Sequence, residues 1–145
     1  MTAAIASDKP GHARWARAER IVAGLTVFDG LLGLVVWLVA GSASGRLALL
    51  SLLALFAGTG AWRRRSAGHL AALAFYGLHL ATYHAFDGTG SYLLRGALNL
   101  GAVIHLPNAV LVLNVFAIGM FAASAALLWW RVRVGADSRA RTSKS

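Results

Sequence analysis

Four long runs of apolar residues constrain the fold of this chain more than any other feature. Asp29 is the only acid inside these runs. A helix needs about 20 mostly apolar residues to cross the roughly 30 Å of hydrocarbon in a bilayer. With 58% hydrophobic and 13% charged residues, the 145-residue chain is also too apolar for a soluble domain of this size. The runs therefore predict an all-α, four-helix transmembrane bundle with spans at about 21–40, 45–62, 68–86 and 107–130.

The basic residues predict how this bundle is oriented. Twelve of the 14 Lys and Arg residues lie in the N-terminal tail, in the Arg63–Arg65 loop and in the C-terminal tail, and only Arg46 and Arg95 lie elsewhere. Four spans place all three basic regions on one side, which the positive-inside rule assigns to the cytoplasm. We therefore predict a multi-pass protein of the inner membrane with N-in and C-in topology, whose partners include anionic headgroups of the lipid bilayer.

The same pattern predicts the domain organisation. Residues 1–18 and 135–145 are polar and basic, and we expect them to be disordered tails on either side of a transmembrane domain at 19–134. The first apolar run is longer than the roughly 7 to 15 residues of a signal peptide, so we expect it to be a retained helix. The basic residues are not interleaved with aromatic ones, which disfavours nucleic acid as a partner.

The polar side chains within the spans are the candidate site. Ionisable groups at membrane depth are costly and usually face a protein interior. Counting about 1.5 Å per residue from the cytoplasmic boundary places Asp29 and Tyr76 at roughly 12 Å depth and His79 at roughly 16 Å. Asn114 lies roughly 10 Å from the opposite boundary by the same count. We expect a ligand or proton site formed by Asp29, Tyr76, His79, Tyr83 and Asn114.

A second group of polar residues is predicted at the outer interface. It consists of His84, Asp87, His105 and Asn108. Two histidines on antiparallel helices are a conceivable haem b ligand pair, but we favour hydrogen bonds to headgroups or loops for them. Residues 90–102 are too apolar for a free loop, and we expect an outer interfacial helix there. The chain contains no cysteine, which excludes thiolate metal sites and disulfide chemistry, and no metal-binding motif is visible.

One segment resembles a known family. Residues 49–84 read LLSLLALFAGTGAWRRRSAGHLAALAFYGLHLATYH, an apolar helix ending in Gly-x-Gly, a short basic turn and an Ala/Leu-rich helix ending in His. This pattern is similar to the DoxX-like family of small four-helix bacterial membrane proteins. The first helix has the glycines of that family and lacks its Lys. The resemblance implies a membrane partner of redox enzymes, linked to quinone chemistry because the missing cysteines exclude the thiol branch.

Three functions are compatible with these observations. The first is an accessory protein whose buried Asp/His/Tyr/Asn cluster binds a quinone or a lipid, alone or with a membrane redox complex. The second is a proton-coupled small transporter or channel that acts as a homo-oligomer, with Asp29 and His79 carrying the proton. The third is a small membrane-embedded enzyme that uses the same two residues as acid and base.

Overall fold

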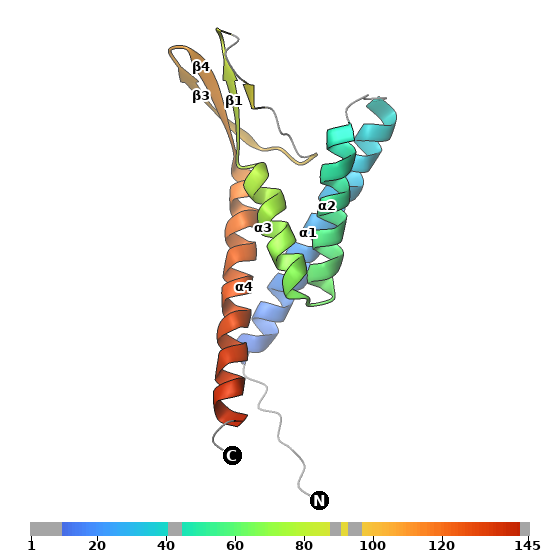
Figure 1. The fold of residues 1–145 in the computed structure, drawn as a ribbon, viewed down its shortest axis with the longest axis vertical. Coiled ribbons are helices and arrows are strands. Elements are labelled where there is room, and N and C mark those ends of the chain that lie inside the picture. Colours follow the sequence, from blue (N-terminus) through green and yellow to red (C-terminus); the bar gives the residue numbers. More distant parts are fainter. Residues whose placement is uncertain (1–9, 41–44, 88–90, 93–96, 143–145) are drawn as a thin grey trace, which may run out of the picture.

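The described part of the chain forms four helices with a small antiparallel sheet at one end (Figure 1). The computed structural model describes residues 10–40, 45–87, 91–92 and 97–142. The helices are α1 (Pro10–Ala40), α2 (Gly45–Trp62), α3 (Ser66–Leu78) and α4 (Val115–Thr142). The strands are β1 (Ala81–Ala85), β2 (Ser91–Tyr92), β3 (Gly101–Leu106) and β4 (Ala109–Asn114).

Three of the helices are long and apolar enough to cross a membrane. These segments are Ala13–Val39 of α1, Gly45–Trp62 of α2 and Val115–Val134 of α4. Large apolar side chains are exposed along them, among them Phe28, Leu49 and Trp129. Such exposure suits a lipid-facing surface, because lipid tails rather than water surround it. The chain is thus a mostly helical membrane protein, as its composition predicts.

The third predicted span differs from the structure. Helix α3 ends at Leu78 after 13 residues, and the chain continues as strand β1 instead of reaching residue 86 as a helix. A 13-residue helix is only about 20 Å long, so α3 is too short to cross a bilayer by itself. Tyr83 and Thr82 are residue types that favour strands, and hydropathy alone does not register that preference.

The predicted start of the last span and the predicted interfacial helix are also different in the structure. Residues 101–106 and 109–114 form a β-hairpin, joined by a two-residue turn at Pro107 and Asn108, and α4 begins only at Val115. β-Branched residues such as Val103 and Ile104 suit this conformation. Residues 97–100, within the expected interfacial helix, are not helical; residues 93–96 lie outside the described region of the chain.

The expected disordered tails are partly helical. Helix α1 begins at Pro10, inside the predicted N-terminal tail, and α4 continues to Thr142, inside the predicted C-terminal tail. Pro10 suits the first turn of a helix, where its missing N–H is not needed. Residues 1–9 and 143–145 lie outside the described residues.

The sheet has the strand order β2-β1-β4-β3, and all neighbours are antiparallel. Figure 1 shows it at the end of the molecule away from both termini. We call this the sheet end. The opposite end, with the basic turn at residues 63–65 between α2 and α3, is the basic end.

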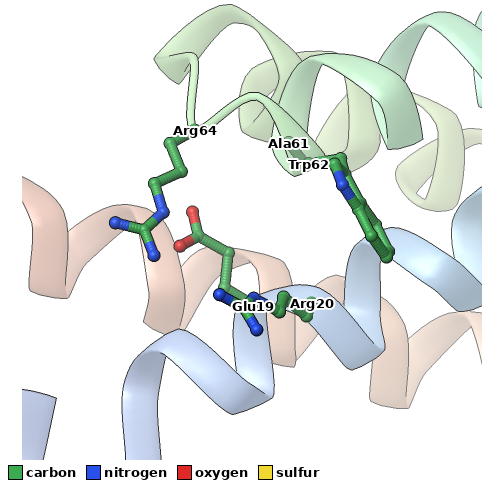
Figure 2. A pocket seen from close by; sticks show the side chains of 5 residues that line it. All are labelled: Glu19, Arg20, Ala61, Trp62 and Arg64. Carbon is green, nitrogen blue, oxygen red and sulfur yellow. The ribbon is translucent and has the colours of Figure 1, made fainter. Parts of the chain in front are cut away.

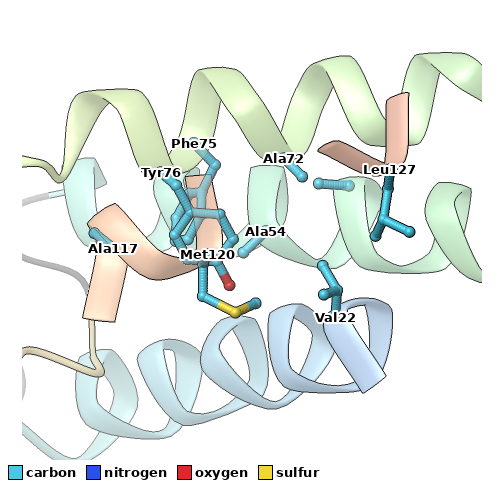
Figure 3. Packing of buried hydrophobic residues seen from close by; sticks show 9 residues of the cluster. Val22, Ala54, Ala72, Phe75, Tyr76, Ala117, Met120 and Leu127 are labelled. Atoms are coloured by element: carbon cyan, nitrogen blue, oxygen red, sulfur yellow. The ribbon is translucent and has the colours of Figure 1, made fainter. Parts of the chain in front are cut away.

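The helices pack around a core of mainly small and aromatic side chains (Figure 3). Helix α3 lies between α2 and α4, and α1 packs closely on α2. The close approach of α1 and α2 depends on Gly58, where a Cβ atom would lie 2.6 Å from Cγ2 of Val27 and 2.8 Å from its backbone nitrogen. Buried members of the core are Val22, Ala54, Ala57, Ala72, Phe75, Tyr76, Ala117, Met120 and Leu127.

Candidate functional site

Helices α1 and α3 run in the same direction and face each other with matched polar side chains. Helix α1 carries Glu19, Thr26 and Asp29, and α3 with its C-terminal cap carries His69, Tyr76 and His79. The spacing is seven and then three residues on both, so each set lies on one side of its helix. The members of each pair are 50 residues apart in sequence. We call these six residues the polar interface.

All six residues are buried. None is more than 4% exposed, and His69 and Thr26 are fully buried. Burying a polar group costs free energy unless it is hydrogen-bonded, and burying a charge costs more unless it is paired. The contacts of each pair therefore show how the fold satisfies this requirement.

The basic-end pair is Glu19 and His69. Nε2 of His69 lies 2.9 Å from Oε1 of Glu19, and Nη2 of Arg131 lies 2.5 Å from the same oxygen. Nη1 of Arg131 donates to the backbone carbonyl of Arg64, which ties α4 to the turn after α2. A stacked pair of rings, Trp15 and Trp130 at 5.5 Å, holds α1 against α4 nearby. Glu19 is thus a buried carboxylate with two cationic or polar partners.

The middle pair is Thr26 and Tyr76. The Tyr76 hydroxyl donates to Oγ1 of Thr26 over 3.2 Å, and the Thr26 hydroxyl donates to the carbonyl of Val22 over 2.8 Å. Ser124 lies seven residues before Arg131 on α4, and Thr26 lies seven residues after Glu19 on α1. Because α1 and α4 are antiparallel and Arg131 is bound to Glu19, Ser124 and Thr26 lie at the same level along the helices. The Ser124 hydroxyl is fully buried and has no hydrogen-bond partner among the described residues.

The sheet-end pair is Asp29 and His79, and no hydrogen bond joins their side chains: Nδ1 of His79 faces the carbonyl of Phe75, and its Nε2 has no partner among the described residues. Oδ1 of Asp29 accepts a hydrogen bond of 3.0 Å from the backbone N–H of Leu98. Asn114 donates from Nδ2 to the carbonyl of Leu98 over 3.4 Å and accepts at Oδ1 from the N–H of Ala117 over 3.1 Å, as an N-cap of α4 does. Asp29 and Asn114 together hold the segment that leads into β3.

Both histidines keep one ring nitrogen without a partner. Nδ1 of His79 lies 2.6 Å from the carbonyl of Phe75, which can only accept, so this nitrogen carries a proton. The carboxylate of Glu19 likewise fixes the proton of a neutral His69 on Nε2. Nε2 of His79 and Nδ1 of His69 are buried and have no hydrogen-bond partner within the ranges that the structure describes. In the neutral imidazole each is a free proton acceptor.

The structure brings together most of the residues predicted within the spans. Asp29, Tyr76 and His79 are all buried between α1 and α3, and Asn114 is linked to Asp29 through the backbone of Leu98. Tyr83 does not take part, because it lies exposed on β1, opposite Leu111 and Tyr92. The shortened α3 explains this: a strand alternates its side chains, so Tyr83 no longer follows the helical face of His79.

The residues predicted at the outer interface lie on or beside the sheet rather than on helices. His84 on β1 and His105 on β3 both pair with Val110 of β4, so they share one face with Val110 between them. Asp87 follows β1, and the carbonyl of Asn108 accepts from the N–H of Phe86 over 3.0 Å. The pair of antiparallel helices on which the haem b hypothesis rested is absent from the described residues here.

Sequence reasoning missed Glu19 and His69. Glu19 is the first residue of the predicted transmembrane domain, beside Arg20, and His69 is near the start of the predicted third span, after the Arg63–Arg65 turn, so neither lies at the depth of the polar residues predicted within the spans. The signal that reveals them is the repeated offset of 50 residues between an acid or hydroxyl and its aromatic partner. Arg131 carries no such signal, because its contact depends on how α4 packs.

A cavity of about 310 Å³ opens beside Glu19 at the basic end (Figure 2). Glu19, Arg20, Ala61, Trp62 and Arg64 line it. Arg20, Trp62 and Arg64 are exposed, so the cavity reaches the surface of the protein. The buried carboxylate of the basic-end pair is therefore accessible from this end.

Comparisons of the sequence with protein-family models and with curated proteins, and of the structure with solved structures, find no match. Within the described ranges, no three His, Asp or Glu side chains gather as a metal site would require. The chemistry of the site therefore has to be inferred from its own residues.

Proposed function

We propose that this small membrane protein moves protons across the bilayer along the polar interface between α1 and α3. The observation that carries this proposal is the series of three buried pairs, each with groups that exchange protons. An acid and a histidine lie at each end, and two hydroxyl groups lie between them. Buried titratable pairs of this kind are typical of proton relays in membrane proteins.

The order of the groups supplies a path for the relay. A proton enters through the cavity beside Glu19 and protonates its carboxylate. For each transfer the proton of neutral His69 first moves from Nε2 to Nδ1 by a change of tautomer; Nε2 then accepts the proton of Glu19, and Nδ1 releases its own proton towards the middle pair. The proton then leaves towards the sheet end through His79 and Asp29. The reverse path uses the same groups. Histidine suits both steps because its unperturbed pKa lies near neutrality.

The spacing requires water between the first two pairs. Seven helical residues separate Glu19 from Thr26, a rise of about 10 Å, whereas three residues or about 4.5 Å separate Thr26 from Asp29. A proton crosses the longer step only through bridging groups. The buried Ser124 hydroxyl, at the level of Thr26, is a suitable partner for such a water molecule.

We favour a proton relay over quinone binding because Asp29 and Asn114 are both engaged with the protein's own backbone. Both hydrogen-bond to the backbone of Leu98 and hold a segment of the chain there. The membership in the DoxX-like family that residues 49–84 suggest stays a prediction, as do the inner-membrane location and the orientation.

The test is proton flux into liposomes that contain the purified protein and a pH-sensitive dye. The double variant Thr26→Val/Tyr76→Phe removes both hydroxyl groups of the middle pair and leaves no orphaned partner. We expect its flux to fall at least about tenfold, to the level of empty liposomes. The proposal is wrong if this variant conducts as the wild type does.

A matched control removes the same two kinds of hydroxyl outside the polar interface. The Ser51 hydroxyl donates to the carbonyl of Leu47 over 2.8 Å, and the Tyr92 hydroxyl donates to the carbonyl of Leu78 over 2.9 Å. The variant Ser51→Ala/Tyr92→Phe should conduct as the wild type does. An equal loss of flux in both double variants would show that the effect is general destabilisation and would refute the relay.

A further inference from the structure

A second cavity lies close to the one beside Glu19, and Trp62 lines both. This second cavity has a volume of about 290 Å³ and is lined by Gly24, Val27, Thr59, Trp62 and Arg63. Both cavities are formed by one side of α1 and the last turns of α2. We call the two together the Trp62 crevice.

The two cavities of the Trp62 crevice differ in chemistry. The cavity beside Glu19 is polar, because it carries Arg20 and Arg64 as well as that carboxylate. The other is apolar, since its walls are mainly Gly24, Val27 and the Trp62 ring, with Arg63 at its edge. The polar cavity lies nearer the start of α1. The apolar cavity lies further along the same helix, where the apolar run of this span has begun.

The charge of the crevice is positive overall. Three guanidinium groups face one carboxylate, and that carboxylate is already bound by Arg131 at 2.5 Å. Arg64 is held in this place by an unusual backbone, with φ of 56°, which non-glycine residues rarely adopt. Its amide donates to the carbonyl of Ala61 over 2.9 Å, and its own carbonyl accepts from Arg131. Figure 2 shows Arg64 and Trp62 on either side of Glu19.

We propose that the Trp62 crevice binds one anionic phospholipid. Its phosphate lies against Arg20 and Arg64, and the start of an acyl chain lies along Gly24 and Val27 beside the Trp62 ring. The guanidinium group of arginine can donate two parallel hydrogen bonds to phosphate oxygens, and tryptophan is enriched at the interface between lipid headgroups and hydrocarbon. A free phosphate would use only the polar cavity, whereas a lipid uses both cavities at once. This proposal does not depend on the proton relay.

The test is native mass spectrometry of the full-length protein in detergent, titrated with phosphatidylglycerol or with phosphatidylcholine. We expect phosphatidylglycerol to bind at least about tenfold more tightly, and Arg64→Gln or Arg20→Gln each to weaken it about fivefold. Arg133→Gln is the matched control, since Arg133 lines neither cavity. Its guanidinium carbon lies 3.8 Å from the centroid of the Trp129 ring. Equal weakening by Arg133→Gln would show unspecific attraction to basic residues and would overturn the proposal.

Two further arms separate a lipid from its headgroup. In the first, glycerol 3-phosphate should not displace phosphatidylglycerol at equal concentration. In the second, Trp62→Ala should lower the affinity of the protein for phosphatidylglycerol, whereas Trp129→Ala should leave this affinity unchanged. Full displacement by glycerol 3-phosphate would mean a simple phosphate site and would contradict the proposal. The Thr26→Val/Tyr76→Phe variant should keep its lipid affinity, so a failure of the relay is distinguishable from a failure of this site.

Discussion

The hydrogen bond between Tyr76 and Thr26 predicts an asymmetric response to mutation. Thr26→Val leaves the Tyr76 hydroxyl, in a side chain only 1% exposed, without this partner. An orphaned buried polar group costs about 1–3 kcal/mol. Tyr76→Phe is milder, because the Thr26 hydroxyl still donates to the carbonyl of Val22. We expect it to cost about 0.5–1.5 kcal/mol, the net value of one hydrogen bond.

The double variant should be more stable than the sum of the two single effects implies. Removing both partners leaves no orphaned group, so the coupling free energy should be about 0.5–1.5 kcal/mol. The assay is reversible unfolding in detergent micelles, followed for the wild type, both single variants and the double variant. Equal and additive losses for Thr26→Val and Tyr76→Phe would refute the reasoning, since they would mean that the two hydroxyl groups do not depend on each other.

Three further sets of variants test Asp29, the Glu19–Arg131 ion pair and the turn at Arg64. Asp29→Asn keeps an oxygen that accepts from the Leu98 N–H, so it should change the free energy of unfolding by less than about 1 kcal/mol while abolishing proton flux. Asp29→Ala removes this acceptor and should lower the free energy of unfolding by about 1–3 kcal/mol in the same assay. Arg131→Met leaves the buried Glu19 with His69 as its partner and should lower the free energy of unfolding by about 3–5 kcal/mol. The double variant Glu19→Gln/Arg131→Met should recover most of this loss. Additive losses from the two substitutions would contradict the ion pair. Arg64→Gly removes the side chain that makes the positive φ costly, so it should raise the free energy of unfolding by up to about 1 kcal/mol. It should also lower the affinity for phosphatidylglycerol. A lower free energy of unfolding would show that the turn is not strained.

The sequence was sufficient to predict the membrane class and the three helices that are long and apolar enough to span a bilayer. Length and apolarity are the physical requirements for crossing a bilayer, and α1, α2 and α4 show both. The same measure failed at residues 81–86 and 101–114, because an apolar strand and an apolar helix have similar hydropathy. The β-branched residues on both sides of Pro107 and Asn108 were the available signal for a hairpin.

The candidate site was partly predictable for a similar reason. Counting residues from a common boundary placed Asp29 near Tyr76 and His79, since helices that run in the same direction rise equally. The contacts of Asp29 and Asn114 with Leu98 could not be predicted, because Leu98 lies in a segment without regular structure, which these tertiary contacts hold in place. Thr26 looked like an ordinary helical threonine until Tyr76 was placed opposite it.

Proton flux in liposomes tests the central claim most directly. The wild type should acidify the lumen when a pH gradient and a compensating potassium current are imposed, and Thr26→Val/Tyr76→Phe should not. The control Ser51→Ala/Tyr92→Phe should behave as the wild type. A wild-type protein that conducts no faster than empty liposomes, or a double variant that conducts as well as the wild type, would contradict a proton relay between α1 and α3.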